Sequence, residues 1–430
     1  MKKGFVALLL VLALIVIVSP GIIGRLAEKS MDENIEWAAK ESDELVVTSQ
    51  GFDRGWFSSE GRHRIELRDG DIRDTLLALA GADASAHVPA LIIETHLDHG
   101  LVPVGSMTHE KGTLVPGLGS AVSTLAIELD DGREFPVPGK IHSTVGLAGD
   151  LRSNYVLEAG DTDIDGNTVS WSDVDIVVST SPSSGDFEFE GTVPLFEIVS
   201  MTDSVQIEGI SFSGEQRPTP YGVRVGPLDF SIDSVGSAML RRDVGPFEFK
   251  SRSHLDDERI SFDVELDVSN TPFEDYGDGS MKLEMRLLDA DGGALANIKR
   301  RVERAQYAIY PAELEADVQR LAAAGFEFHV DRLDISLPQG VIESEFHIMV
   351  DESDRDDFAW SSLLLDTEAS AELSLPAELV DMATATSSDL NAAIGMGFLR
   401  LEGDAYVVEA ELRNGLFEVN GAPMPLPWTQ

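Results

Sequence analysis

The chain lacks cysteine and is poor in positive charge, and both deficits restrict what it does. None of the 430 residues is cysteine, which excludes disulfide bonds, thiolate metal ligands and a cysteine nucleophile. Lysine and arginine together number 32 against 76 aspartates and glutamates, so the formal net charge is −44. A charge of that sign repels the phosphate backbone of DNA and RNA. The sequence therefore predicts that nucleic acid is not a partner.

Lysine is the scarcer of the two basic residues, at 9 of the 32. An acidic surface with few lysines is typical of proteins that work in concentrated salt, because dissolved ions screen the repulsion between like charges. We therefore expect a halophilic or marine protein.

Long apolar runs are also missing, with one exception at the N-terminus. Residues 4–24 carry no charge, and as a helix of about 1.5 Å per residue they reach roughly 32 Å, enough to cross a hydrocarbon core of about 30 Å. A cleaved signal peptide is the alternative, but it needs small residues in an Ala-x-Ala-like pattern. The run ends instead in Val-Ile-Val-Ser-Pro-Gly-Ile-Ile-Gly, which favours an uncleaved transmembrane signal anchor.

The charges beside this run predict its orientation. Lys2 and Lys3 precede it within residues 1–3, which favours a cytoplasmic N-terminus. Residues 25–44 read as a stalk helix. Because no second apolar run follows, we expect the remaining chain to lie outside the cytoplasm, with the membrane as its partner through residues 4–24.

Residues 45–430 read as a β-rich domain. Apolar and polar residues alternate in short runs such as 187–190, 205–208 and 261–268, a period of two that leaves one face of a strand buried and the other in solvent. Asp-Gly pairs that favour tight turns separate the runs: Asp69-Gly70, Asp131-Gly132, Asp165-Gly166, Asp278-Gly279 and Asp291-Gly292. Helical spacing occurs late, near residues 294–324 and 376–397. The predicted fold is mainly β, a β-rich α+β protein with a long curved antiparallel sheet, hairpins and a few late helices.

Motifs for catalysis or cofactor binding are not found. The sequence contains no Gly-x-Ser-x-Gly elbow, phosphate-binding Gly-Lys-Ser/Thr loop, dinucleotide fingerprint or His-Glu-x-x-His helix. The histidines cluster once, at His96-x-Asp98-His99. On a strand His96 and Asp98 share a face while His99 points away, which argues against a metal site. We therefore predict no catalytic residue and no cofactor.

One acidic segment offers a weak metal candidate. Asp161, Asp163 and Asp165 alternate before Gly166, like the first half of a calcium-binding loop. The twelfth position of that loop needs a bidentate glutamate but holds Ser172. The pattern favours a hairpin turn, with calcium binding as the alternative.

Three stretches resemble a known family. They are Gly51-Phe52-Asp53-Arg54-Gly55-Trp56-Phe57-Ser58-Ser59, the segment from Glu94 to Pro103 with Asp98-His99-Gly100 at its centre, and the Asn-Gly hairpin between Arg413 and Met424. In this order they are similar to motifs of the YdgA-like bacterial proteins, a family of unknown function. Leu101 stands where that family usually has proline. The resemblance spans nearly the whole chain.

The resemblance implies a Gram-negative inner-membrane protein with its body in the periplasm, and it carries over no catalytic residue. The motif residues Arg54, Gly55, Trp56, Phe57, Ser58, Ser59, Asp98, His99 and Gly100 are binding candidates of unknown role. A purely structural role is the alternative. Arg54-Gly55 also fits a turn between two strands, and His99 also fits the end of a strand.

Two functions follow from these observations. The first is a non-enzymatic envelope structural or binding module, with an apolar groove for a lipid, a lipoprotein or another envelope protein. The alternative is a periplasmic hydrolase, such as a glycosidase, which needs two carboxyl groups roughly 5 to 10 Å apart in a cleft.

Overall fold

The computed structural model describes residues 45–424 with gaps. The gaps are 56–57, 71–72, 74–87, 89, 100–118, 129–131, 147, 165–166, 182, 201–203, 238–242, 274–275, 305–310, 354–362, 364 and 385–386. Within the described residues no helix is long and apolar enough to cross a membrane. The predicted anchor at 4–24 and the stalk at 25–44 lie outside those residues.

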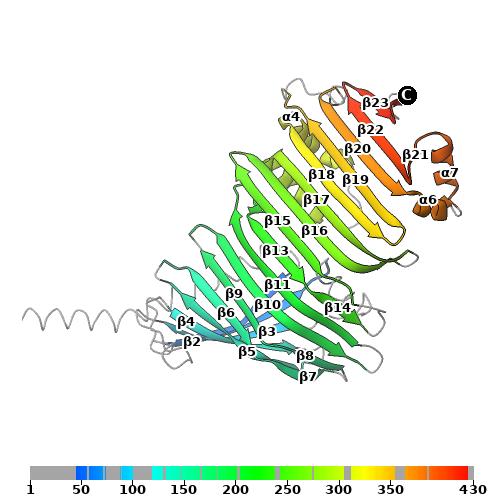
Figure 1. The fold of residues 1–430 in the computed structure, drawn as a ribbon. Helices are drawn as coiled ribbons and strands as arrows, with labels where there is room; N and C mark the ends of the chain where they lie inside the picture. The colour runs from blue at the N-terminus through cyan, green and yellow to red at the C-terminus, as the bar shows by residue number, and fades with distance from the viewer. Residues whose placement is uncertain are drawn as a thin grey trace, which may run out of the picture. The chain divides into compact units, whose positions relative to one another are not determined.

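The described chain is mainly β-structure, and its strands form one large open antiparallel sheet (Figure 1). The contacts divide it into two units, one of residues 1–162 and 170–193, the other of residues 163–169 and 194–430. The mainly β fold with late helices is therefore confirmed.

The first unit is an antiparallel meander. β1 pairs with β2, and the pairing continues through β3, β4, β5, β6 and β9 to β10. The hairpin of β7 and β8 is inserted between β6 and β9. The strands are β1 (Leu45–Arg54), β2 (Ser58–Leu67), β3 (Ala90–His99), β4 (Gly119–Glu128), β5 (Glu134–Val145), β6 (Leu151–Leu157), β7 (Gly160–Ile164), β8 (Asn167–Trp171), β9 (Val174–Ser181) and β10 (Asp186–Val199). The described residues of 163–169, in β7 and β8, and the end of β10 belong to the second unit.

The second unit continues the same pattern. β11 pairs with β13 and β14, and the sheet runs from β13 through β15, β16, β17, β18, β19, β20 and β22 to β23 and β24. The strands are β11 (Ser204–Pro218), β12 (Arg224–Val225), β13 (Pro227–Ile232), β14 (Ser234–Ser237), β15 (Phe247–Asp256), β16 (Arg259–Phe273), β17 (Gly277–Asp291), β18 (Phe326–Leu337), β19 (Gly340–Val350), β20 (Thr367–Pro376), β21 (Arg400–Glu402), β22 (Ala405–Arg413), β23 (Leu416–Val419) and β24 (Ala422–Met424).

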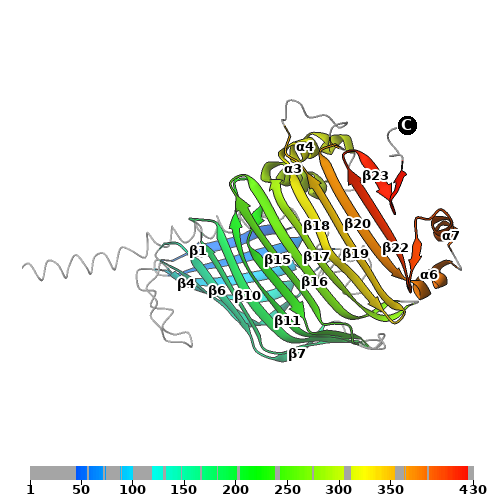
Figure 2. The same ribbon diagram turned by 45° about the horizontal axis from the view of Figure 1, so that its top comes forward.

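Four helices with bounds lie in the described residues, all late in the chain. α3 (Gly292–Arg304) and α4 (Pro311–Ala324) connect β17 to β18, pack on each other and contact β17 (Figure 2). α6 (Ala377–Thr384) and α7 (Ser388–Gly395) follow β20, and α6 contacts β20 and β22. Five alanines of α3 and α4 are nearly inaccessible to solvent: Ala294, Ala296, Ala322, Ala323 and Ala324. Alanines at these positions allow the two helices to approach each other closely.

Turn chemistry explains one hairpin well. Arg413 on β22 pairs with Leu416 on β23, which leaves Asn414 and Gly415 as a two-residue loop. Their φ angles are 53° and 74°, and both must be positive in the turn type that matches the twist of a hairpin. The Asn-Gly hairpin expected near the C-terminus is present.

Two of the predicted Asp-Gly turns are wrong. Asp278 and Gly279 lie inside β17, where a Cβ on Gly279 would come within 2.4 Å of the Ser336 carbonyl oxygen, so this glycine allows two strands to approach closely. Asp291 ends β17 and accepts a hydrogen bond of 2.8 Å from the backbone of Ala294. It begins a helix rather than a hairpin, because aspartate satisfies the free N–H groups of a helix N-terminus.

Candidate functional site

One face of the second unit's sheet is apolar across nine strands. The registers join single residues of β11, β13, β15, β16, β17, β18, β19, β20 and β22 into one cross-strand row. Its members are Phe212, Phe230, Phe249, Leu266, Leu283, Leu333, Ser344, Leu373 and Val408. We call this set the apolar row. Ser344 is its one polar member.

The apolar row is only half-buried. All nine of its side chains have intermediate exposure, although an apolar sheet face is ordinarily covered by a second layer. Fully buried residues on the same face lie near one end of the strands, at Leu287 and Val350. The helices that contact β17 and β20 therefore leave the row partly accessible to solvent.

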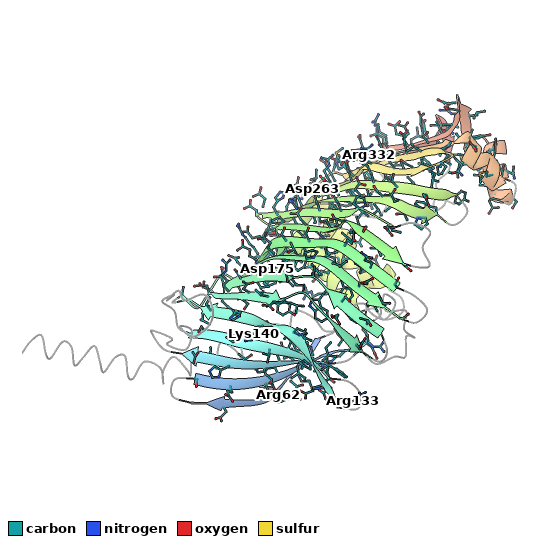
Figure 3. All side chains as sticks on the ribbon, turned by 60° about the horizontal axis from the view of Figure 1, so that its bottom comes forward. Arg62, Arg133, Lys140, Asp175, Asp263 and Arg332 are labelled. Carbon is teal, nitrogen blue, oxygen red and sulfur yellow. The ribbon has the colours of Figure 1, made fainter. Side chains whose placement is uncertain are left out.

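The opposite face is charged. On β15 the exposed residues Glu248, Lys250 and Arg252 alternate with less exposed apolar or small ones. Asp263 on β16 and Arg332 on β18 belong to this charged face (Figure 3). Alternation at period two thus separates an apolar surface from a polar one.

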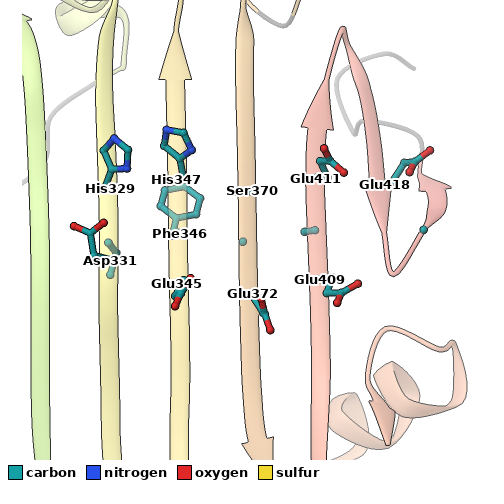
Figure 4. A pocket seen from close by; sticks show the side chains of 14 residues that line it. His329, Asp331, Glu345, Phe346, His347, Ser370, Glu372, Glu409, Glu411 and Glu418 are labelled. Atoms are coloured by element: carbon teal, nitrogen blue, oxygen red, sulfur yellow. The ribbon is translucent and has the colours of Figure 1, made fainter. Parts of the chain in front are cut away.

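A hollow of about 520 Å³ lies on the charged face of β18, β19, β20, β22 and β23 (Figure 4). We call it the acidic hollow. Its polar lining residues are His329, Asp331, Glu345, His347, Ser370, Glu372, Glu409, Glu411 and Glu418.

Carboxylates directly oppose one another in the acidic hollow. Glu345 pairs with Glu372 across β19 and β20, and Glu372 pairs with Glu409 across β20 and β22. Like charges in such positions destabilise a sheet. Arg400 lies 3.4 Å from Glu409, and Arg413 lies 3.1 Å from Glu411, so these arginines offset part of the repulsion.

Asp331 is the lining carboxylate with a bidentate partner. Its two oxygens accept hydrogen bonds of 2.6 Å each from the Arg286 guanidinium. These bonds lower the pKa of Asp331 below its usual value, and the same bonds raise the pKa of Arg286. Both side chains are more than a third exposed, so we expect the pair to contribute at most about 1 kcal/mol.

Replacing Arg286 tests this pair. In Arg286→Gln the pKa of Asp331 should rise toward the usual value of about 3.9. Because the folded-state pKa is depressed, the pair stabilises the fold above that usual value, and the contribution disappears as pH falls through the folded-state pKa. NMR titration of labelled aspartates, with Asp331→Asn for assignment, measures the shift. Arg252→Gln breaks another exposed arginine–aspartate pair, in which Nη2 of Arg252 donates to both carboxylate oxygens of Asp229, and should leave the pKa of Asp331 unchanged; an equal shift in both variants would refute the assignment.

The structure brings two of the family-like motifs together in the first unit. Ser58 on β2 pairs with Asp98 on β3, and Ser59 pairs with both Leu97 and Arg54. Gly55 forms the turn through a 2.8 Å bond from its N–H to the Ser58 carbonyl. The expected turn at Arg54-Gly55 is present. The side chains of Arg54 and His99, and all of Trp56, Phe57 and Gly100, lie outside the described residues.

These motif residues do not form a metal centre in the described part. His96 lies 3.5 Å from Asp98 and 3.6 Å from Glu60, and its side chain is 47% exposed. A second hollow of about 770 Å³ lies beside them, lined by Arg62, Lys140 and Glu94 among others. Arg62 forms ion pairs with Glu94 and Glu134, which partly neutralise its charge.

The acidic segment forms the hairpin β7–β8. Asp161 and Asp163 are exposed on β7, and Asp163 accepts a 2.8 Å bond from the Thr168 hydroxyl across the hairpin. Asp165 and Gly166 lie outside the described residues. A hairpin turn is the arrangement that the sequence favours, and calcium binding stays the untested alternative.

The sequence alone did not reveal the cluster of Glu327, His329 and His347. Glu327, His329 and Asp331 alternate on β18, which is a visible signal, but only the register of β18 with β19 places His347 opposite His329. The apolar row was missed for the same reason, since its members come from nine separate strands.

The fold and the two surface features define a mainly β protein with one open antiparallel sheet, which in its second unit is apolar on one face and charged on the other, with an acidic hollow on the charged face. The chain belongs to a bacterial family of unknown function, DUF945, whose model matches residues 1–427. No curated protein and no solved structure is significantly similar to it.

Proposed function

We propose that this protein is a YdgA-like, inner-membrane-anchored binding module that faces the periplasm and holds lipid acyl chains on the apolar row. The observation that carries this proposal is the half-buried apolar row across nine strands. Residues 4–24, as an anchor, tether the chain to a membrane that supplies lipid.

The chemistry of the row favours acyl chains over a protein partner. Protein interfaces are about 56–58% non-polar and carry hydrogen bonds at intervals. The row instead offers one hydroxyl, that of Ser344, among eight apolar side chains. Covering the remaining apolar surface gains roughly 25 cal/mol per Å² without requiring any directional bond. Such a surface selects for apolar chains rather than for a particular headgroup.

Lipid content tests the proposal. The full chain, extracted from membranes in mild detergent and washed, should retain acyl lipids that mass spectrometry detects at about one or more per chain. A single-pass membrane protein without an apolar sheet, purified in parallel, sets the background. Lipid at or below that background would argue against the proposal.

Opposed carboxylates in the acidic hollow support the alternative, a hydrolase with paired carboxylates. Glu345, Glu372 and Glu409 are cross-strand neighbours, and a pair of carboxyl groups that flank the substrate serves as acid and base or nucleophile in glycosidases. Hydrolysis of model glycosides by the full chain, abolished in Glu372→Gln, would favour this alternative; no hydrolysis above buffer would exclude it for those substrates.

A further inference from the structure

Two histidines that line the acidic hollow converge with a glutamate. His329 on β18 pairs directly with His347 on β19, and Glu327 precedes His329 by two residues, so all three lie on one face. One ligand atom from each lies within 4.8 Å of the other two. The Glu327 carboxylate is 3.0 Å from Nε2 of His329.

His347 has a nitrogen without a partner. Its Nε2 atom is shielded from solvent and forms no hydrogen bond, an arrangement that costs free energy in a folded protein. Its ring stacks on His329, with centroids 4.2 Å apart and planes at 16°. A ligand that accepts a lone pair from Nε2 removes that cost.

We propose that Glu327, His329 and His347 bind one divalent transition-metal ion of the zinc class. Two imidazole nitrogens and one carboxylate oxygen form a three-residue ligand set that leaves a coordination position for water or for a further ligand. Imidazole suits zinc, copper, iron and nickel, whereas calcium and magnesium take oxygen ligands. The histidines therefore select against the two most abundant divalent ions.

The rings need a small movement to share an ion. A metal–nitrogen bond lies in the plane of the imidazole, so two stacked rings must tilt toward a common point. The χ2 torsion of histidine is broad, and the rotation leaves the strand pairing of His329 with His347 unchanged.

Charges around the cluster favour a cation. Glu345 and Glu372 line the same hollow as the two histidines. Arg286 is the cross-strand neighbour of His329 on β17, but its guanidinium is engaged by Asp331. Negative potential in a hollow raises the local concentration of cations.

The test uses the full chain in detergent, without a histidine tag, stripped with chelator and desalted. Titration with Zn²⁺ should show one site per chain, and Co²⁺ should give visible absorption bands of a low-symmetry nitrogen–oxygen site. His329→Ala and His347→Ala should each weaken Zn²⁺ binding beyond the roughly 10- to 100-fold typical of losing an outer partner of a ligand. Mg²⁺ and Ca²⁺ should not compete at tenfold excess.

Two control variants distinguish this site from non-specific binding of Zn²⁺ to acidic side chains. His254→Ala removes an exposed histidine from β15 of the same unit and should leave Zn²⁺ binding unchanged. Glu345→Gln removes a nearby charge but no ligand and should weaken binding only a few-fold. If either histidine variant fails to fold, the Co²⁺ spectrum of the wild type and of Glu327→Gln decides, since replacing the carboxylate ligand by a neutral amide must change it. Unchanged affinity in the folded histidine variants, an equal loss in His254→Ala, or an unchanged Co²⁺ spectrum in Glu327→Gln would overturn the proposal.

Discussion

The double variant Leu266→Asp/Leu283→Asp is expected to bind a fluorescent acyl lipid at least about tenfold more weakly than the wild type while staying folded. The two leucines are cross-strand neighbours in the apolar row. Covering their carboxylates with an acyl chain costs several kcal/mol, whereas tenfold in affinity corresponds to about 1.4 kcal/mol. Because both positions keep contact with solvent, the carboxylates stay hydrated in the ligand-free fold, and their repulsion across the two strands should lower its melting temperature without unfolding it.

Lys282→Asp is the matched control. Lys282 lies next to Leu283 on β17 but points to the charged face, where it is 3.0 Å from Asp267. The Lys282→Asp variant introduces the same side chain on the same strand and should leave the lipid affinity within about twofold of the wild type. Equal loss in the control, or no loss in the double variant, would show that the apolar row does not hold the lipid. Circular dichroism and melting temperature monitor the fold of each variant.

The melting temperature of the full chain is expected to rise between 0.05 M and 1 M sodium chloride. The net charge of −44 raises the energy of the compact state, and opposed glutamates such as Glu345 and Glu372 add local repulsion. The Debye length falls from about 10 Å at 0.1 M to about 3 Å at 1 M. Most of the gain should therefore come within the first few tenths molar.

The anion separates screening from solute exclusion. At matched ionic strength, chloride and sulfate should raise the melting temperature equally if screening dominates, whereas exclusion from the surface favours sulfate and needs high concentration. Glu372→Gln removes the middle one of the three cross-strand glutamates Glu345, Glu372 and Glu409 and should reduce the salt dependence of the melting temperature. A flat or falling melting temperature would remove both the repulsion argument and the expectation of a halophilic protein.

Local sequence pattern predicted the strands and helices well, because period-two alternation and helical spacing are visible within ten residues. The strand at 261–268 became part of β16, and the helical segment at 294–324 became α3 and α4. Asp-Gly pairs were less reliable. Gly279 instead lets a neighbouring strand approach closely, and Asp291 instead caps a helix. Tertiary context therefore decides whether an Asp-Gly pair forms a turn.

Neither surface feature was available from the sequence alone. His347 lies opposite His329 only because a register shift between Val330 and Leu333 on β18 sets their alignment. A shift of one residue would send either side chain to the other face. The apolar row depends on registers between nine strands, and its partial exposure depends on where the helices pack.

Photo-crosslinking tests the central claim most directly. The full chain in native membranes is mixed with a lipid that carries a photoreactive group within its acyl chain, irradiated, digested and sequenced by mass spectrometry. The adducts should fall on apolar-row residues such as Phe249, Leu266 and Leu283, and the Leu266→Asp/Leu283→Asp variant should lose them. Adducts confined to residues 4–24, or spread equally over the charged-face neighbours Lys250, Glu265 and Lys282, would contradict a lipid-holding role for the apolar row.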